Sequence, residues 1–286
     1  AETFEPGSVG KVISMSGYLQ MGLHKMSDQL SVPDHITQEG QTYKDSFDHG
    51  TERWTLAGIL QNSSNVGMIM AGENYPDEQR YEYLTKFGIG QPTGLNLPGE
   101  SSGLLTNPSA WDLRTRNTIL FGQGYTVNAL QLNNVVATIA NKGVKQQQSI
   151  IKSTTDANGK TTETKKGEAT RVVDEKVASD MMNAMESVAE GYNKFVKVDG
   201  YRMAAKSGTA EVQGSDGTLS SIISDYSVVI PADNPRYAVT VVMKDPNGVF
   251  GGLTAGPVSA QICEFLMQKY EVPVSGPRKN AIPVTW

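Results

Sequence analysis

Ser8 and Lys11 form the first pair of residues whose types and spacing could do chemistry. The Glu5-Pro6-Gly7 turn precedes them, and apolar residues then recur at helical spacing up to Gly22, which predicts a helix over residues 8–22. Residues three apart share one face of a helix, so the hydroxyl and the amine would be neighbours. A lysine kept neutral by its surroundings can take the proton of a serine hydroxyl and make it a nucleophile.

Two further polar groups could complete such a site. Ser63 and Asn65 supply a hydroxyl and an amide, and Lys206-Ser207-Gly208-Thr209 supplies a cation, two hydroxyls and a glycine. In a strand, the latter group suits a ligand with a carboxylate end, because the cation attracts it and Gly208 lets a ligand backbone come close. Each group alone has an ordinary explanation as a capped helix or a turn. Their order, S-x-x-K, S-x-N and K-S-G, resembles the S-x-x-K, S-D-N and K-T-G set of penicillin-binding proteins and class A β-lactamases.

The elements that must position these groups are helices early in the chain and antiparallel strands late in it. The second group falls inside a helix predicted over residues 54–71, and the third inside a strand predicted over residues 201–212. Two more strands are predicted over residues 226–230 and 237–242, and a hairpin over 150–152 and 161–164 turns at Asn158-Gly159. Residues 31–50 are expected as a loop or short hairpin, residues 94–108 as an extended loop, and the other helices over 76–86, 129–141, 177–189 and 257–270.

The composition excludes several classes of function. The 286 residues carry a formal charge of −5 and no basic run, which argues against nucleic-acid binding. No stretch approaches the roughly 20 apolar residues of a membrane span. Cys263 is the only cysteine and is expected as a buried thiol, while His24, His35 and His49 lack metal-ligand spacing and are interpreted as non-catalytic. We therefore expect neither a metal ion nor a cofactor.

A family resemblance extends over nearly the whole chain, from residue 4 to about residue 270. It is carried by Phe4-Glu5-Pro6-Gly7-Ser8, Ser63-Ser64-Asn65-Val66-Gly67, Phe87-Gly88-Ile89-Gly90, Leu97-Pro98-Gly99-Glu100, Gly122-Gln123-Gly124 and Ala232-Asp233-Asn234-Pro235-Arg236-Tyr237. These segments resemble the transpeptidase domain of class B penicillin-binding proteins, most of all the septal, cell-division member of actinobacteria. The resemblance implies the penicillin-recognising serine transpeptidase/β-lactamase-like fold, a mixed α/β (α+β) fold whose antiparallel sheet has helices on both sides.

The same resemblance implies a peptidoglycan D,D-transpeptidase and assigns the reacting groups. Ser8 would attack the carbonyl of the penultimate D-alanine of a stem peptide, or a β-lactam ring. Lys11 would take the serine proton. Ser63 would relay a proton to the leaving amine, and Asn65 would hold the substrate amide.

The remaining assignments concern substrate binding. Lys206 would supply positive potential, and Ser207 and Thr209 would bind the terminal carboxylate; Ser207 stands where many relatives have threonine, which preserves the hydroxyl. The backbone N–H groups of Ser8 and Thr209 would form the oxyanion hole. Gln123-Gly124 would line the cleft or form a tight structural turn.

The resemblance also implies that residues 1–286 are one transpeptidase domain that lacks its N-terminal strands. In this family, strands of the central sheet precede the S-x-x-K motif, and only seven residues precede Ser8. Three strands alone would leave an unpaired edge, which proteins normally cover. We therefore expect a longer protein with pedestal and anchor regions upstream. The missing strands would come from there or from a separate N-terminal polypeptide segment.

The implied location is the extracytoplasmic face of the bacterial membrane, with a single-pass N-terminal anchor outside this chain. The implied partners are peptidoglycan stem peptides ending in D-Ala-D-Ala, β-lactam antibiotics, and a divisome glycosyltransferase with related membrane proteins.

Three alternative functions remain open from the sequence. Class A β-lactamases place a glutamate between the second and third motifs to activate a deacylating water, and no Glu-x-x-Leu-Asn run lies between Asn65 and Lys206. A D,D-carboxypeptidase would use the same site with water as acceptor. A β-lactam receptor would bind and signal without turnover. Dependence on an acceptor amine distinguishes a transpeptidase from all three.

Overall fold

The computed structural model describes residues 2–38, 40–213, 219–248 and 250–286. Its centre is an antiparallel sheet in the order β11 (Tyr237–Lys244), β10 (Leu219–Ile230), β9 (Ala204–Gln213). The three predicted strands are present, but β10 begins seven residues before the expected start at 226. The register places Asp225 of β10 opposite Gly208 of β9, so the third motif lies on a strand at one edge of this sheet.

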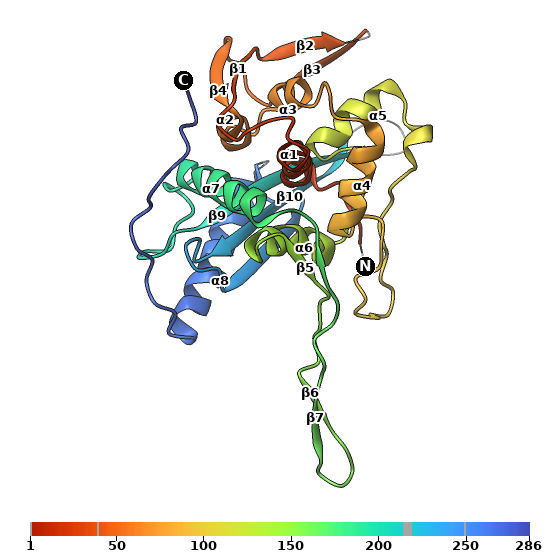
Figure 1. Ribbon diagram of the computed structural model, residues 1–286, viewed down its shortest axis with the longest axis vertical. Coiled ribbons are helices and arrows are strands. Elements are labelled where there is room, and N and C mark those ends of the chain that lie inside the picture. Colours follow the sequence, from red (N-terminus) through yellow and green to blue (C-terminus); the bar gives the residue numbers. More distant parts are fainter. Residues whose placement is uncertain (1, 39, 214–218, 249) are drawn as a thin grey trace.

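Helices cover both faces of the sheet, as expected (Figure 1). One face packs against α6 (Ala129–Ala140) and α7 (Glu175–Gly191), and the other against α8 (Gly251–Lys269). Helix α8 begins six residues earlier than predicted, because Pro257 lies inside it and does not mark its start. Cys263 of α8 is fully buried, which confirms the prediction of a buried thiol.

The segment that carries Ser8 and Lys11 lies in the largest hydrophobic core of the described residues. A short 3₁₀ turn, η1 (Gly7–Gly10), runs directly into helix α1 (Lys11–Gln20), so the helix predicted over residues 8–22 is confirmed with a tighter first turn. Eight of the ten residues of α1 are buried. A helix enclosed in this way holds its side chains in fixed directions, which suits a reacting group.

The prediction of one continuous helix over residues 54–71 is wrong. The segment contains strand β4 (Glu52–Thr55), helix α2 (Leu56–Gln61) and helix α3 (Asn65–Ala71). The break occurs at Ser63, whose φ of 56° is in the left-handed region that non-glycine residues rarely adopt. The second motif therefore lies in a turn between two helices, with Asn65 as the first residue of α3.

The remaining elements are small. Strand β1 (Gln29–Val32) pairs with β4, and β2 (His35–Gln38) pairs with β3 (Gln41–Lys44), which confirms a short hairpin within residues 31–50.

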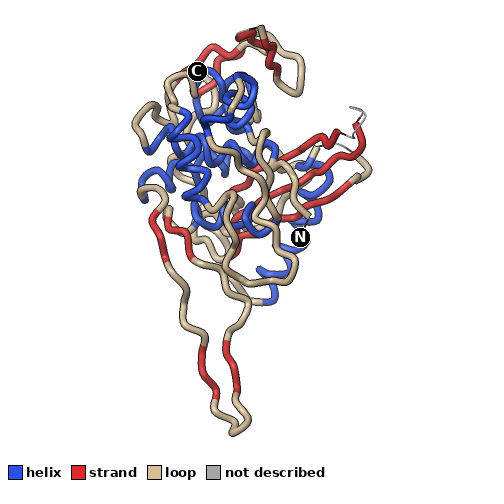
Figure 2. Tube along the Cα trace, turned by 90° about the vertical axis from the view of Figure 1, so that its right-hand side faces the viewer, coloured by secondary structure: helices blue, strands red, loops and turns tan. Residues whose placement is uncertain are grey.

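The polar hairpin at Asn158-Gly159 projects far from the body of the molecule (Figure 2). Its strands are β6 (Ser153–Thr155) and β7 (Thr161–Glu163), and the first of them begins three residues later than predicted. The other elements are α4 (Asp77–Phe87), η2 (Pro108–Ala110), α5 (Leu113–Thr118), η3 (Ile119–Phe121), β5 (Val144–Gln146) and β8 (Ala169–Arg171). Among the described helices, none combines the length and apolar character needed to cross a membrane.

Candidate active site

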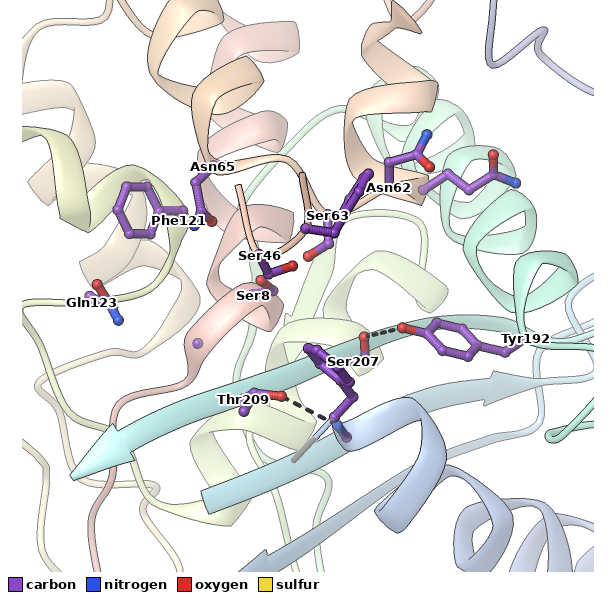
Figure 3. A pocket seen from close by; sticks show the side chains of 15 residues that line it. Ser8, Ser46, Asn62, Ser63, Asn65, Phe121, Gln123, Tyr192, Ser207 and Thr209 are labelled. Carbon is purple, nitrogen blue, oxygen red and sulfur yellow. Dashed lines mark hydrogen bonds between the residues drawn. The ribbon is translucent and has the colours of Figure 1, made fainter. Parts of the chain in front are cut away.

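Gly7 brings the first motif against the third. Its φ is +50°, and a Cβ atom on it would lie 2.5 Å from the carbonyl oxygen of Thr209 and 2.8 Å from the Thr209 nitrogen. A side chain here would strain the turn and collide with strand β9. The glycine thus lets Ser8 stand directly over the strand, as Figure 3 shows for Ser8, Ser207 and Thr209.

The amine of Lys11 contacts all three of its neighbours in the first two motifs. The Nζ atom lies 2.7 Å from Ser8 Oγ, 2.7 Å from Asn65 Oδ1 and 2.8 Å from the carbonyl oxygen of Ser63. A neutral amine has two N–H groups and one lone pair. It can donate to the two carbonyl-type oxygens and accept from the Ser8 hydroxyl, so this geometry suits a base.

The electrostatics favour the same protonation state. Lys11 is fully buried, and burial lowers its pKa well below the ordinary value for lysine. The positive charge of Lys206 lowers the Lys11 pKa further, while Asp45 acts in the opposite direction. Burial also lowers the pKa of Lys206 to about 7. A low-dielectric site with two lysines is one in which an amine readily gives up its proton.

The hydroxyl of Ser63 lies between the two lysines. Its Oγ atom is 3.0 Å from Lys206 Nζ and 3.3 Å from Lys11 Nζ. The left-handed backbone at Ser63 aims the hydroxyl at both amines, which a continuous helix would not do. Strain of this kind is often held at sites of function. The arrangement offers a path for a proton between the two amines.

Asp45 holds the second motif in place, and the sequence analysis missed it. Its carboxylate is fully buried and accepts hydrogen bonds from Ser64 Oγ at 2.6 Å and from the backbone N–H groups of Asn65 at 2.6 Å and Val66 at 3.0 Å. His49 Nε2 lies 3.0 Å from the same carboxylate. An acidic group at a helix N-terminus accepts hydrogen bonds from the free N–H groups and interacts favourably with the positive end of the helix dipole. No local pattern links residues twenty positions apart, so only the fold reveals this contact.

The hydroxyls of the third motif also have partners outside it. Ser207 Oγ lies 3.2 Å from the hydroxyl of Tyr192, and the backbone N–H of Gly251 donates to Thr209 Oγ1 at 3.3 Å. Lys206 Nζ donates to the carbonyl oxygen of Ser207 at 3.0 Å and is itself fully buried. Tyr192, which sequence reasoning did not identify, thus belongs to the same hydroxyl cluster (Figure 3).

These groups surround one cleft of about 430 Å³. Its walls include Ser8, Ser63, Asn65, Gln123, Ser207 and Thr209, with Lys11 and Lys206 buried beneath them.

Two of the predicted substrate-binding residues, Gly124 and Gly208, do not line this cleft. The N–H of Gly124 donates instead to Glu5 at 2.8 Å, which fits a structural turn. The missing side chain of Gly208 makes room for Asp225 and for the carbonyl oxygen of Pro6. The assignment of Gly208 to substrate binding stays a prediction.

Metal-assisted chemistry has no candidate centre in the described part of the chain. No group of three or more His, Cys, Asp or Glu side chains there could hold a metal ion.

The chain is similar to known proteins along its whole length. Residues 1–264 match the family described as the penicillin binding protein transpeptidase domain. Penicillin-binding protein PbpB of Mycolicibacterium smegmatis is 34% identical over 286 residues, covering 95% of this chain and 44% of that protein. Peptidoglycan D,D-transpeptidase FtsI of Escherichia coli is 35% identical over 267 residues, covering 91% of this chain and 43% of that protein. The chain thus spans less than half the length of these curated relatives.

Solved structures agree with the sequence comparison. A peptidoglycan synthetase from Bifidobacterium adolescentis superposes with a TM-score of 0.96 at 69% identity, covering all of this chain and 53% of that one. Penicillin binding protein 3 of Mycobacterium tuberculosis, in complex with ampicillin, gives a TM-score of 0.92 at 32% identity, covering all of this chain and 66% of that one. The expected fold and the expected resemblance are both confirmed. The chain belongs to the penicillin binding protein transpeptidase domain family.

Proposed function

We propose that this domain is a peptidoglycan D,D-transpeptidase that cross-links stem peptides through an acyl-enzyme on Ser8 and that β-lactams inactivate covalently. One observation carries the proposal: Ser8 Oγ lies 2.7 Å from the amine of a fully buried Lys11, whose pKa is well below that of an ordinary lysine. That amine can hold the serine proton as the oxygen attacks.

The first half-reaction forms the ester. Ser8 Oγ attacks the carbonyl carbon of the penultimate D-alanine while Lys11 takes its proton, and the N–H groups of Ser8 and Thr209 stabilise the oxyanion. The bond to the terminal D-alanine then breaks. Its amine receives a proton that passes from Lys11 through Ser63, whose hydroxyl lies 3.3 Å from the lysine nitrogen.

The second half-reaction transfers the acyl group. The amine of a second stem peptide attacks the ester carbonyl, loses its proton to the basic groups of the site, and forms the new amide as Ser8 regains its hydrogen. Lys206, Ser207 and Thr209 bind the terminal carboxylate of the donor peptide, and Asn65 holds its amide. Ser207 and Thr209 line the cleft, and Lys206 Nζ donates to the carbonyl oxygen of Ser207 at 3.0 Å, which supports this assignment.

The lining of the cleft favours a transpeptidase over a class A β-lactamase. Among the described residues that line it, none is a glutamate or an aspartate. No carboxylate there can therefore activate a water against the ester, which is the role the class A glutamate plays in deacylation. The names of the relatives from M. smegmatis and E. coli, and the ampicillin complex of the M. tuberculosis protein, support the same assignment.

We extend the proposal to the cellular setting. The domain acts in septal wall synthesis on the extracytoplasmic face of the membrane, with a divisome glycosyltransferase and related membrane proteins as partners and a single-pass anchor in the full-length protein. Residues 1–286 form one domain whose sheet is completed by further strands, from an upstream region or a separate segment, pairing with β11. The half-exposed side chains along β11, an edge strand among those described, support this.

Intact mass spectrometry after incubation with a penicillin tests the activity. We expect one covalent adduct, mapped by peptide digestion to Ser8 and absent from Ser8→Ala. An adduct on another residue, or undiminished labelling of Ser8→Ala, would overturn the proposal. Cross-linking of a D-Ala-D-Ala peptide that depends on an added acceptor amine then separates a transpeptidase from a carboxypeptidase or a receptor.

A further inference from the structure

Asp225 of β10 is a buried acid beneath the cleft that the proposed mechanism does not use. Its side chain is fully buried, and neither carboxyl oxygen has a hydrogen-bond partner in the described part of the structure. An ionised carboxylate without donors is costly to bury, and buried polar groups in proteins are normally paired. The position of this group therefore calls for a physical explanation.

The backbone around Asp225 places it against the nucleophile turn. Asp225 lies opposite Gly208 in the sheet register. A Cβ atom built on Gly208 would collide with both Asp225 Oδ2 and the carbonyl oxygen of Pro6. Two oxygens, one from strand β10 and one from the turn that leads into Ser8, thus border the space that a side chain on Gly208 would fill. The glycine of the third motif is what allows them to approach.

Two neighbouring oxygens attract each other only if one carries a hydrogen. A carboxylate would repel the carbonyl oxygen of Pro6, whereas a neutral carboxylic acid has an O–H that can donate to it. Burial raises the pKa of Asp225 well above its ordinary value, and the opposing effect of Lys206 is smaller. Both considerations favour the neutral acid.

The ionisable groups around Asp225 are few. Lys206 faces it from β9, and Lys11 lies beyond Lys206 at the start of α1. Its partner on β11 is Val242. Turn η1, helix α6 and the first turn of α8 contribute no ionisable side chain. The protonation state of Asp225 therefore depends on its burial and on one nearby lysine.

We propose that Asp225 is a positioning residue which, as a neutral acid, donates its O–H to the carbonyl oxygen of Pro6 and ties the Ser8 turn to the central sheet. This hydrogen bond fixes the N–H of Ser8 relative to the N–H of Thr209, the two donors assigned to the oxyanion hole. The inference rests on the proposed function, because it assigns a role in positioning the nucleophile. The competing explanation is an ionised Asp225 that serves as counter-ion of Lys206.

Two substitutions separate these explanations. Asp225→Asn keeps a neutral N–H donor of the same shape, and we expect it to acylate with a penicillin within about twofold of the wild-type rate. Asp225→Leu keeps the approximate shape without a donor, and we expect acylation to slow by about tenfold or more. Asp199→Asn is the matched control, since it makes the same substitution at an exposed aspartate that does not line the cleft, and we expect it to leave the rate unchanged.

An infrared measurement gives a readout independent of catalysis. The unliganded wild-type protein at neutral pH is expected to show the C=O stretch of a protonated carboxylic acid that is missing from Asp225→Asn. This band reports the state of Asp225 whether or not Ser8 reacts. Absence of any Ser8 adduct in the wild type would instead contradict the proposed function, so the two failures are distinguishable.

Three results would overturn the inference. One is a missing protonated-acid band, and another is an asparagine variant as slow as the leucine variant; each of these supports a counter-ion of Lys206. The third is a folded leucine variant that acylates at the wild-type rate, because the donor then contributes nothing. If the leucine variant fails to fold, the rate of the asparagine variant and the infrared band still distinguish a neutral Asp225 from an ionised counter-ion of Lys206.

Discussion

The amine of Lys11 and the amide oxygen of Asn65 lie 2.7 Å apart, although 54 positions separate them in the chain. This contact joins the first motif to the second and orients the amine toward Ser8. The side-chain nitrogen of Asn65 lies 3.2 Å from the carbonyl oxygen of Lys44, which fixes the amide so that its oxygen faces the lysine. The amide oxygen therefore accepts one N–H of Lys11 and leaves the lone pair of the neutral amine for Ser8, as the proposed mechanism requires.

Removal of the Asn65 amide should slow acylation. Asn65→Ala leaves one N–H of Lys11 without an acceptor in a buried site, which costs about 1–3 kcal/mol. We expect the acylation rate constant for a penicillin to fall by about ten- to hundredfold. Asn62→Ala is the control, because Asn62 lines the same cleft but donates to the carbonyl oxygen of Gly58 and not to the base. Equal rates in both variants would contradict a role for Asn65 in orienting Lys11.

The pH dependence of acylation should have a rising limb that Lys206 controls. In the proposed mechanism Lys11 acts only when unprotonated, so we expect the acylation rate to rise with pH as Lys11 loses its proton. The charge of Lys206 lowers the Lys11 pKa, so Lys206→Ala should raise that pKa and shift the limb to higher pH. In the wild type a falling limb should follow, because Lys206, with a pKa of about 7, loses the charge that attracts the substrate carboxylate. Second-order acylation rates measured across the pH range test this, and superimposable rising limbs would exclude the coupling.

The acyl-enzyme should be long-lived. None of the described residues lining the cleft is a carboxylate that could activate a water against the Ser8 ester. Unassisted hydrolysis is slow, so the penicillin adduct should persist for hours in time-resolved intact mass spectrometry. Loss of the adduct within seconds, with hydrolysed drug accumulating, would establish a β-lactamase instead.

Much of the fold could be predicted because its elements carry local signals. The apolar spacing after Ser8 predicts α1, and the turn-forming residues around Asp233-Asn234 separate the two strands β10 and β11. The start of α8 was misplaced because Pro257 is tolerated inside that helix. The break at Ser63 was missed because the residues around it fit a helical pattern, and the left-handed turn there depends on contacts from elsewhere in the chain.

The site shows the same division. The residue types of the three motifs could be read from the sequence, since a nucleophile, a base and a carboxylate-binding strand have recognisable chemistry. The residues that contact and position these motifs could not be predicted from the sequence. Asp45, Tyr192 and Asp225 are distant from them in sequence and act through tertiary contacts that no local pattern encodes.

Replacement of Asp45 should lower the stability of the protein. It should also shift the pH dependence of acylation in the direction opposite to the shift expected for Lys206→Ala. Asp45→Asn substitutes an amide for a carboxylate that accepts from Ser64, Asn65 and Val66, so some of these donors lose their acceptor. We expect a loss of about 1–3 kcal/mol in the free energy of unfolding, measured by chemical denaturation. The carboxylate also raises the pKa of Lys11, so its removal should lower that pKa and move the rising limb of acylation to lower pH.

The control for Asp45 is Asp48→Asn, the same substitution at an exposed position three residues away. Asp48→Asn should change neither the free energy of unfolding nor the pH at which the acylation rate rises. A shift of the Asp45→Asn limb to higher pH, in the same direction as Lys206→Ala, would show that the carboxylate affects Lys11 through the position of Asn65 and not through its charge. Ser64→Ala separates the two effects, because it removes one donor to Asp45 at 2.6 Å and leaves the charge in place. Ser64→Ala should therefore lower the free energy of unfolding, while the rising limb of acylation stays at the same pH as in the wild type.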